Sequence, residues 1–290
     1  MAHTPTPAAK SVLVTGATGG LGNAVASRLA AEGWTVHAAV RTTPDAQRLA
    51  ALPGDVRPVL LDVTDEESVR QAAQEVGGRL DGLVNSAGLI VQGFWEQVPD
   101  DSLRRQFEVN VIGLMSVTRA FLPALRAAHG RVVNIGALSS LVALPFFGPI
   151  AASKAALASM TDSLRIELHH QGVKVALVEP GAMETEIFDR AARSAQADGL
   201  AGGPEVERTY ARALESAAAS VAATKLRPVD QAVKAVHHAL TARRPGTRYL
   251  VGPDARMVRV ARRLPTGVRD RALLGALKLG PASFAVDPAR

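Results

Sequence analysis

The sequence contains no cysteine, and only 4% of its 290 residues are aromatic. Without cysteine there is no disulfide framework, no thiolate nucleophile and no cysteine-based zinc or iron–sulfur site. No uninterrupted apolar run approaches the roughly 20 residues of a membrane-spanning helix. Residues 1–10 lack the apolar segment of a signal peptide. We therefore expect a cytoplasmic protein with a short frayed tail over residues 1–10 and no metal site.

The positive charge of the chain is concentrated near its C-terminus. The formal net charge is +6, but residues 243–278 hold ten Lys or Arg and two Asp, so the remainder carries −2. A nucleic-acid-binding domain usually has a basic face on the fold itself together with aromatic stacking groups. We therefore expect no nucleic-acid partner. A weak contact of the basic segment with a membrane surface or a protein remains open.

Hydrophobic side chains make up 47% of the sequence, which is ample for one large core. Short, nearly continuous apolar segments alternate with longer segments of helical spacing. The predicted strands are 11–15, 34–40, 59–61, 80–85, 131–135, 173–178 and 249–251. The predicted helices are 20–32, 66–76, 101–128, 151–170 and 230–242. This alternation is typical of a doubly wound α/β fold, a parallel sheet covered on both faces in three layers.

The predicted organisation is one domain over residues 11–253. Within it, the Ala-rich segment 184–225 follows a predicted strand and is interrupted by Gly202-Gly203-Pro204. Because ligands bind beyond the carboxyl ends of parallel strands, we interpret this segment as a substrate lid. Residues 254–290 are predicted to form a basic amphipathic helical extension.

A glycine-rich turn, TGATGGLG at residues 15–22, joins the first predicted strand to the first predicted helix. Glycines permit a tight turn and let the backbone approach a pyrophosphate closely. The helix N-terminus then offers free N–H groups and the positive end of the helix dipole. The turn therefore predicts a dinucleotide phosphate site.

The second predicted strand ends at Val40, and Arg41 follows it directly. An acidic residue at this place binds the adenosine ribose and repels a 2′-phosphate, whereas an Arg attracts that phosphate. Arg41 therefore favours NADP(H) over NAD(H). A solvated surface Arg is the simpler alternative.

Further motifs follow in a family-specific order: Asp62-Val63, the sequence NSAG at residues 85–88, Asn110, Ser153-Lys154, and Pro180-Gly181 with Thr185. With these motifs the chain resembles the short-chain dehydrogenase/reductase family, in its shorter, non-extended branch, over roughly residues 11–251. The resemblance implies a Rossmann fold and a dinucleotide cofactor. The implied cofactor-binding residues are Gly16, Thr18, Gly20, Leu21, Gly22, Arg41, Asp62, Val63, Asn85, Ala87, Gly88, Lys154, Pro180, Gly181 and Thr185.

The family's chemistry is hydride transfer between the nicotinamide and a carbonyl or alcohol carbon. The resemblance implies a Tyr as proton donor, a Lys four residues later, a Ser 13 residues before the Tyr, and an Asn in a water relay. Here Asn110 and Lys154 are retained as candidate catalytic residues, but Ile150 and Ala137 occupy the usual Tyr and Ser positions. Neither Ile nor Ala can donate a hydrogen bond from its side chain.

Other hydroxyl and acidic groups could in principle replace the missing pair. Tyr210 lies in the predicted lid and could turn inward, whereas Tyr249 on the last strand is expected to pack. Ser139 and Ser140 could point into the cleft, although a surface loop is the simpler interpretation. Ser153 suits cofactor or helix-cap geometry, and Glu179 suits a structural pairing.

Three interpretations remain open. The first is an atypical NADP(H)-dependent oxidoreductase acting on a bulky, hydrophobic carbonyl substrate, such as a polyketide-like secondary metabolite. A phenol or enol of that substrate would supply the proton. The second is a non-redox enzyme on the same scaffold, a cyclase, isomerase or dehydratase. The third is a catalytically silent dinucleotide-binding protein. The family resemblance also leads us to expect a homo-oligomer.

Overall fold

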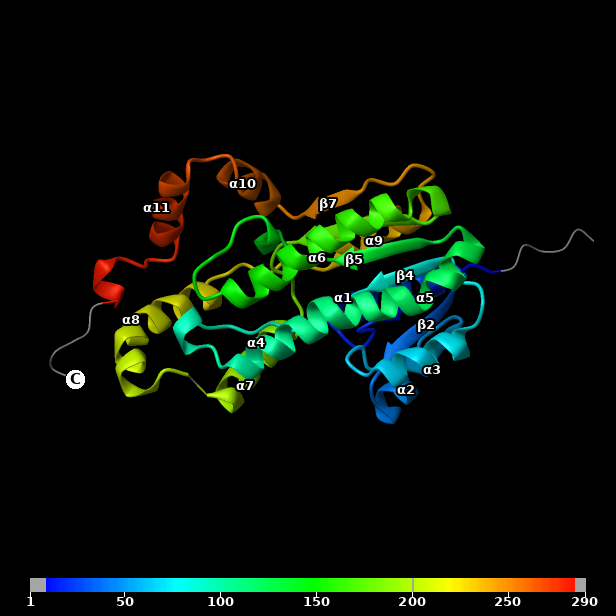
Figure 1. The fold of residues 1–290 in the computed structure, drawn as a ribbon, viewed down its shortest axis with the longest axis horizontal. Coiled ribbons are helices and arrows are strands. Elements are labelled where there is room, and N and C mark those ends of the chain that lie inside the picture. Colours follow the sequence, from blue (N-terminus) through cyan, green and yellow to red (C-terminus); the bar gives the residue numbers. More distant parts are fainter. Residues whose placement is uncertain (1–8, 200, 285–290) are drawn as a thin grey trace, which may run out of the picture.

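A parallel β-sheet forms the centre of the protein in the computed structural model, which describes residues 9–199 and 201–284. Among these residues the sheet has seven strands in the order β3-β2-β1-β4-β5-β6-β7 (Figure 1). The strands are β1 (Ser11–Thr15), β2 (Thr35–Val40), β3 (Val56–Leu60), β4 (Gly82–Asn85), β5 (Arg131–Ile135), β6 (Lys174–Pro180) and β7 (Arg248–Val251). The predicted doubly wound α/β fold is thereby confirmed. Most of the predicted N-terminal tail and residues 285–290 of the extension lie outside the described residues.

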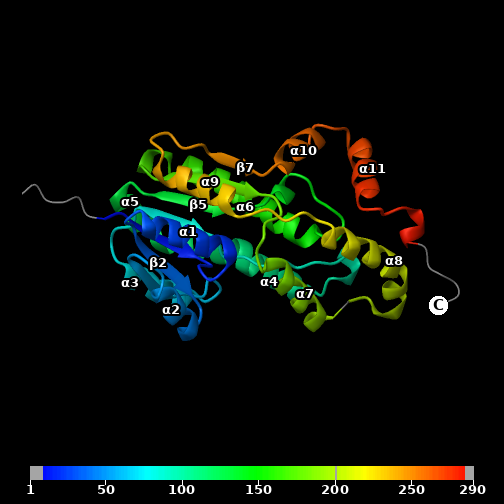
Figure 2. The same cartoon turned by 180° about the vertical axis from the view of Figure 1, so that it is seen from behind.

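Helices cover both faces of the sheet and one of its ends (Figures 1 and 2). They are α1 (Gly20–Ala31), α2 (Thr43–Ala50), α3 (Glu66–Val76), α4 (Asp100–Phe107), α5 (Leu114–Ala128), α6 (Gly148–Glu167), α7 (Ile187–Asp198), α8 (Gly203–Ala222), α9 (Asp230–Thr241), α10 (Asp254–Ala261) and α11 (Thr266–Ala276). Short helical turns add η1 (Trp95–Gln97), η2 (Glu108–Gly113), η3 (Leu138–Ser140), η4 (His169–Gln171) and η5 (Pro281–Phe284).

The apolar strands are buried on both faces because each face carries its own helix layer. On one face Val14 and Val36 pack with side chains of α1 and α9. On the other face Leu13 packs with α3, α5 and α6, and Phe121 of α5 is fully buried there. This two-sided burial explains why the strands are continuously apolar rather than alternating.

The sheet order reverses between β1 and β4, whose register pairs Val12 with Gly82. In doubly wound sheets the ligand site lies beyond the carboxyl ends of the strands at this reversal. The helices α7 and α8 and the C-terminal helices gather at that end of the molecule (Figure 1). The fold therefore places the predicted lid beside the predicted phosphate loop.

Two elements begin three residues earlier than the sequence predicted. The strand predicted at 59–61 begins at Val56. Because β3 is an edge strand, it can include the exposed Arg57 and also Pro58, which interrupt the apolar pattern. The helix predicted at 151–170 begins at Gly148, since Pro149 occupies a first-turn position where its missing N–H costs nothing.

The structure also contains elements that were not predicted. Helix α2 starts after Thr42, whose side chain accepts a hydrogen bond from the backbone N–H of Asp45. The single helix predicted over 101–128 is divided by a π-helical turn at Glu108–Gly113. This wider turn inserts into the helix at Asn110, one of the candidate catalytic residues.

The segment Asp100–Ala128, which is α4, η2 and α5 together, is long and apolar enough to cross a membrane by length and composition. No membrane is needed to explain it, since Val117 and Leu125 are fully buried against the sheet. It is a core helix of the domain.

Candidate active site

The glycine loop between β1 and α1 is too tightly folded to accept a side chain at Gly16 or Gly22. Gly16 has a φ of +65°, and a Cβ there would lie 2.8 Å from the Cα of Ala87. A Cβ on Gly22 would lie 2.3 Å from the carbonyl oxygen of Gly16. Helix α1 follows Gly19, which provides no side-chain cap. The N–H groups of its first turn, at Gly20, Leu21 and Gly22, therefore have no side-chain partner and suit a pyrophosphate.

The loop after β4 is fixed to the glycine loop through Thr15. Its Oγ1 accepts hydrogen bonds from the backbone N–H groups of Ser86 and Ala87, each at 3.1 Å. Asn85, predicted to bind the cofactor, is instead fully buried. Its Nδ2 donates to Thr118 and Asn134, both at 2.8 Å. Asn85 thus supports the cleft from inside the core.

The outer wall of the site contains Arg41, Asp62 and Val63. Arg41 is exposed directly after β2, and no hydrogen bond or ion pair of its side chain is found within the described residues. Asp62 accepts from the backbone N–H and the hydroxyl of Thr64, at 2.9 and 2.7 Å, which fixes the loop after β3. Within the described residues, no partner of Arg41 would therefore compete with a 2′-phosphate for its guanidinium.

A buried polar network holds Asn110 beside the same loop. The Oδ1 of Asn110 accepts from the N–H of Leu89, and its Nδ2 donates to the Leu89 carbonyl, both at 2.9 Å. Gln106, fully buried, donates to the same carbonyl at 2.8 Å and to Ser153 at 3.2 Å. The hydroxyl of Ser153 in turn donates to the Ile150 carbonyl at 3.0 Å. Gln106 was not predicted, because its partners lie on two other segments, the loop after β4 and helix α6.

Lys154 is the buried cation of the site. Its Nζ donates to the carbonyl oxygen of Ile135 at 2.7 Å, and burial lowers the pKa of Lys154 to about 8. A Cβ placed on Gly88 would lie 3.7 Å from this Nζ and 3.3 Å from Oδ1 of Asn110. The structure thus brings Gly88, Asn110 and Lys154 together, as the sequence predicted.

Ile150 lies one helical turn before Lys154 on α6 and is 6% exposed. Ala137 precedes η3 in extended conformation, with φ of −159°. Both side chains are hydrocarbon and can neither donate nor accept a hydrogen bond. They lie where α6 packs against η3, the turn after β5.

The two tyrosines are engaged elsewhere. The ring of Tyr210 stacks on Phe94 with centroids 4.9 Å apart, and burial followed by contact with Glu96 raises the pKa of its hydroxyl. The hydroxyl of Tyr249 accepts from the N–H of Gly246 at 2.8 Å and lies 2.9 Å from Nδ1 of His238. Tyr249 thus packs at the sheet edge, and Tyr210 on α8 is held against Phe94.

Ser140 is bound to a buried carboxylate rather than free in the cleft. Its hydroxyl donates to Glu179, which is fully buried and forms an ion pair of 2.6 Å with Nε of Arg248. Burial raises the pKa of Glu179, while Ser140 and Arg248 oppose that shift. Glu179 therefore makes a structural pairing. For Ser139, no side-chain hydrogen bond is found within the described part of the chain.

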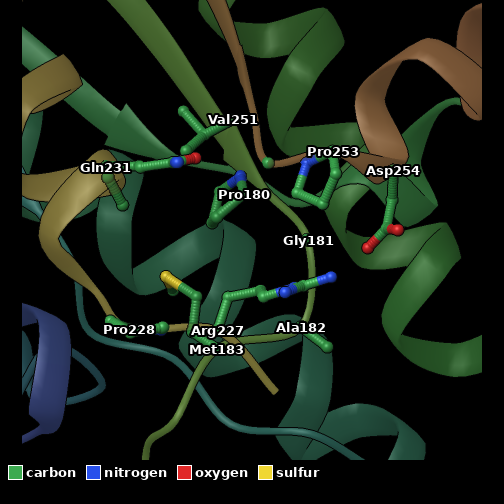
Figure 3. A pocket seen from close by; sticks show the side chains of 12 residues that line it. Pro180, Gly181, Ala182, Met183, Arg227, Pro228, Gln231, Val251, Pro253 and Asp254 are labelled. Carbon is green, nitrogen blue, oxygen red and sulfur yellow. The ribbon is translucent and has the colours of Figure 1, made fainter. Parts of the chain in front are cut away.

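The segment after β6 closes the site from the other side. Thr185 packs against the glycine loop so tightly that a Cβ on Gly20 would lie 2.7 Å from its Cγ2. Behind Pro180 and Gly181 lies a cavity of about 20 Å³, enough for roughly one water molecule. Figure 3 shows Arg227 beside this segment and Asp254 at its far side.

The sequence did not predict an aromatic cluster that packs on α8. Phe94 contacts Phe146, Tyr210 and Phe284, with centroid distances of 5.8, 4.9 and 5.8 Å. Leu279 is buried in the same cluster. It joins the loop after β4, the loop after β5, helix α8 and the C-terminal segment, so no local pattern could have identified it.

Within the described ranges 9–199 and 201–284, no group of three or more His, Asp and Glu could hold a metal ion. The residues present do fit a dinucleotide: they provide a glycine-rich loop, a helix start without a side-chain cap, and an arginine with no partner among the described residues. A Cβ on Gly20 would lie only 2.7 Å from Cγ2 of Thr185, so the two sides of this cradle meet directly.

Comparison with known proteins agrees with this geometry. The family model described as short chain dehydrogenase matches residues 10–196. A 3-amino-tetrahydro-pyrrolizinone reductase of Xenorhabdus hominickii is 34% identical over 264 residues, covering 85% of this chain and 88% of that protein. An NADPH-dependent 3-dehydrocapnine reductase of Ornithobacterium rhinotracheale is 32% identical over 281 residues, covering 92% and 96%. The crystal structure of a short chain dehydrogenase from Burkholderia cenocepacia in complex with NADP has a TM-score of 0.71 and 29% identity, covering 94% and 98%.

Proposed function

We propose, from the premise that the chain belongs to the short-chain dehydrogenase family, that it is an NADP(H)-preferring reductase of a bulky hydrophobic carbonyl compound. Membership makes it an NAD(P)-dependent oxidoreductase of that family. The preference for NADP(H), the substrate class and a proton path without tyrosine are the proposed part. The proposed substrate class includes polyketide-like secondary metabolites.

The chain's own residues define where the cofactor would bind. The N–H groups of the glycine loop would hold the pyrophosphate, and Arg41 would hold the 2′-phosphate. Lys154 and Thr185 would hold the nicotinamide half. Once bound, the nicotinamide supplies hydride exchange with a carbonyl carbon. The relatives named NADPH-dependent or solved with NADP support the choice of cofactor.

The proton path is proposed from the state of the hydroxyl groups. Ile150 and Ala137 donate nothing, and the hydroxyls of Ser140 and Ser153 already donate to Glu179 and to the Ile150 carbonyl. A phenol or enol next to the substrate carbonyl would deliver the proton intramolecularly. An apolar pocket wall at Ile150 also suits a flat, hydrophobic ring system.

The observation that carries the cofactor proposal is Arg41, exposed at the end of β2 with no partner among the described residues. We expect NADPH to bind more tightly than NADH in titration calorimetry. Arg41→Ala should weaken NADPH binding about tenfold or more, because a charge-assisted hydrogen bond to phosphate is lost. NADH binding should be unchanged.

Arg48→Ala on α2 is the matched control, since Arg48 is exposed and forms only a surface ion pair with Asp45. Equal affinity for both cofactors in the wild-type protein, or equal losses for Arg41→Ala and Arg48→Ala, would refute the preference. If no dinucleotide binds, the oxidoreductase proposal fails, and a non-redox enzyme or a silent binding protein becomes the better description.

A further inference from the structure

The C-terminal segment, residues 254–284, is fixed to the body at both of its ends. At its start Ala255 is buried, and Asp254 lies against Gly181, with Oδ2 3.2 Å from where a Cβ would stand. At its end Leu279 is buried, and Phe284 contacts Phe94 and Tyr210. Between these anchors α10 and α11 stand out from the body in both views (Figures 1 and 2). The outer side of α10 is therefore held in a fixed position.

This outer side carries a row of apolar side chains. Met257 is 66% exposed, Val260 61% and Leu264 36%. Met257 and Val260 are three residues apart on α10 and lie on the side opposite the buried Ala255, and Leu264 follows in the bend after the helix. Val268 at the start of α11 is 51% exposed as well. Aliphatic side chains exposed in a row indicate a surface that is covered in use.

Arginines flank this row. Residues 254–284 contain seven Lys or Arg and two Asp, which is +5 of the formal net charge of +6. Arg256, Arg259 and Arg263 are exposed, and none forms an ion pair within residues 9–199 and 201–284. Their long side chains can extend outward beside Met257 and Val260 while keeping the guanidinium in water.

We propose that this surface, the exposed side of α10 with the start of α11, docks on an anionic lipid bilayer. An aliphatic row flanked by arginines can insert shallowly between lipids while the arginines contact their phosphates. A second copy of this chain would bring arginines against arginines. Nucleic acid would favour aromatic stacking groups, and the exposed apolar residues here are aliphatic.

Docking would also position the lid. Because η5 packs on α8, this one helix of the proposed lid lies beside the docked segment and therefore close to the bilayer. A bilayer concentrates bulky hydrophobic carbonyl compounds. This last step rests on the proposed function, whereas docking itself does not.

The test is co-sedimentation of the full chain, without cofactor or substrate, with vesicles of phosphatidylcholine alone or mixed with phosphatidylglycerol. We expect binding only to the mixed vesicles, weakened by high salt. Arg256→Glu with Arg263→Glu should reduce binding about 25-fold or more, since each Arg at such a surface contributes roughly fivefold. Met257→Ser with Val260→Ser should also weaken binding, at unchanged charge.

Arg193→Glu with Lys234→Glu is the matched control, because it makes the same charge change at exposed positions on α7 and α9 and should retain binding. Circular dichroism melting of all variants checks folding. The proposal is overturned by absent binding of the wild-type protein to mixed vesicles, or by equal loss in the control. If Met257→Ser with Val260→Ser changes the mass of the protein in solution but not its binding to vesicles, the surface mediates self-association and the proposal is overturned. Since no dinucleotide is present, these outcomes are independent of the calorimetry.

Discussion

At the scale of single residues, the proposed proton path depends on Ile150 and Ala137. Ile150 is buried one turn before Lys154, so a side chain placed there is close to the retained lysine. A positioned general acid contributes typically 10²- to 10⁴-fold to rate. Under the proposed function, the substrate supplies the proton that such a group would give.

This leads to a gain-of-function prediction. The double variant Ile150→Tyr with Ala137→Ser should raise NADPH-dependent reduction of simple ketones by about 10²-fold or more, because it supplies a proton donor and a carbonyl-polarising hydroxyl. Ketones and quinones that carry a phenol next to the carbonyl should gain far less, because that phenol already donates the proton. Steady-state NADPH oxidation with paired hydroxylated and methyl-ether substrates measures both.

Ile150→Phe with Ala137→Ser adds the ring without its hydroxyl and should give no such gain. An equal rise in this control would show that ring packing, rather than proton donation, is responsible. Unchanged rates in the Tyr variant, with normal NADPH binding, would contradict the inferred redox competence of the scaffold.

At the scale of the elements, the cofactor cradle is a contact between two loops that are far apart in sequence. The start of α1 and the segment after β6 meet at Gly20 and Thr185. Gly20→Ala should displace the Thr185 methyl group and weaken dinucleotide binding about tenfold, in line with the usual cost of overpacking. Adding Thr185→Ser removes that methyl group, keeps the hydroxyl and should restore most of the affinity.

Thr185→Ser alone provides the control for this pair. Its affinity should stay near that of the wild-type protein, and calorimetry with NADPH measures all four proteins. Additive effects of the two substitutions would show that Gly20 and Thr185 act separately, contrary to the geometry.

The sequence predicted most elements because continuously apolar strands and glycine punctuation are local signals. Helix α2 escaped prediction because only one of its side chains, Leu49, is buried. The π-turn at Asn110 was missed because the hydrophobic pattern does not specify which carbonyl each N–H contacts. Gln106 and the Phe94 cluster were missed because their partners come from distant segments.

For the molecule as a whole, buried Lys154 couples stability to pH. Its pKa of about 8 lies below the ordinary value of 10.5. Between these values the unfolded chain binds a proton that the folded chain lacks, so the free energy of unfolding rises with pH. That gain is lost again as the pH falls from about 10.5 to about 8.

Urea unfolding of the cofactor-free protein should therefore show a gain of about 2 kcal/mol from about pH 7.5 to about pH 9.5, relative to Lys154→Met. The variant has no group to titrate at this position, so the difference between the two proteins isolates the lysine. Parallel pH profiles would mean that Lys154 titrates at its ordinary pKa in the folded state.

The all-parallel pairing of the sheet also governs the order of events during synthesis. Strand β1 lies between β2 and β4, and its register with β4 joins Val12 to Gly82. At the usual ribosomal rates of about 5–20 residues per second, β1 waits roughly 4–14 s for β4 to be made. During that interval one apolar edge of the nascent sheet has no neighbour. Slower, cooler expression with abundant chaperones is therefore expected to increase the yield of folded protein, because aggregation competes with a pairing that depends on chain length.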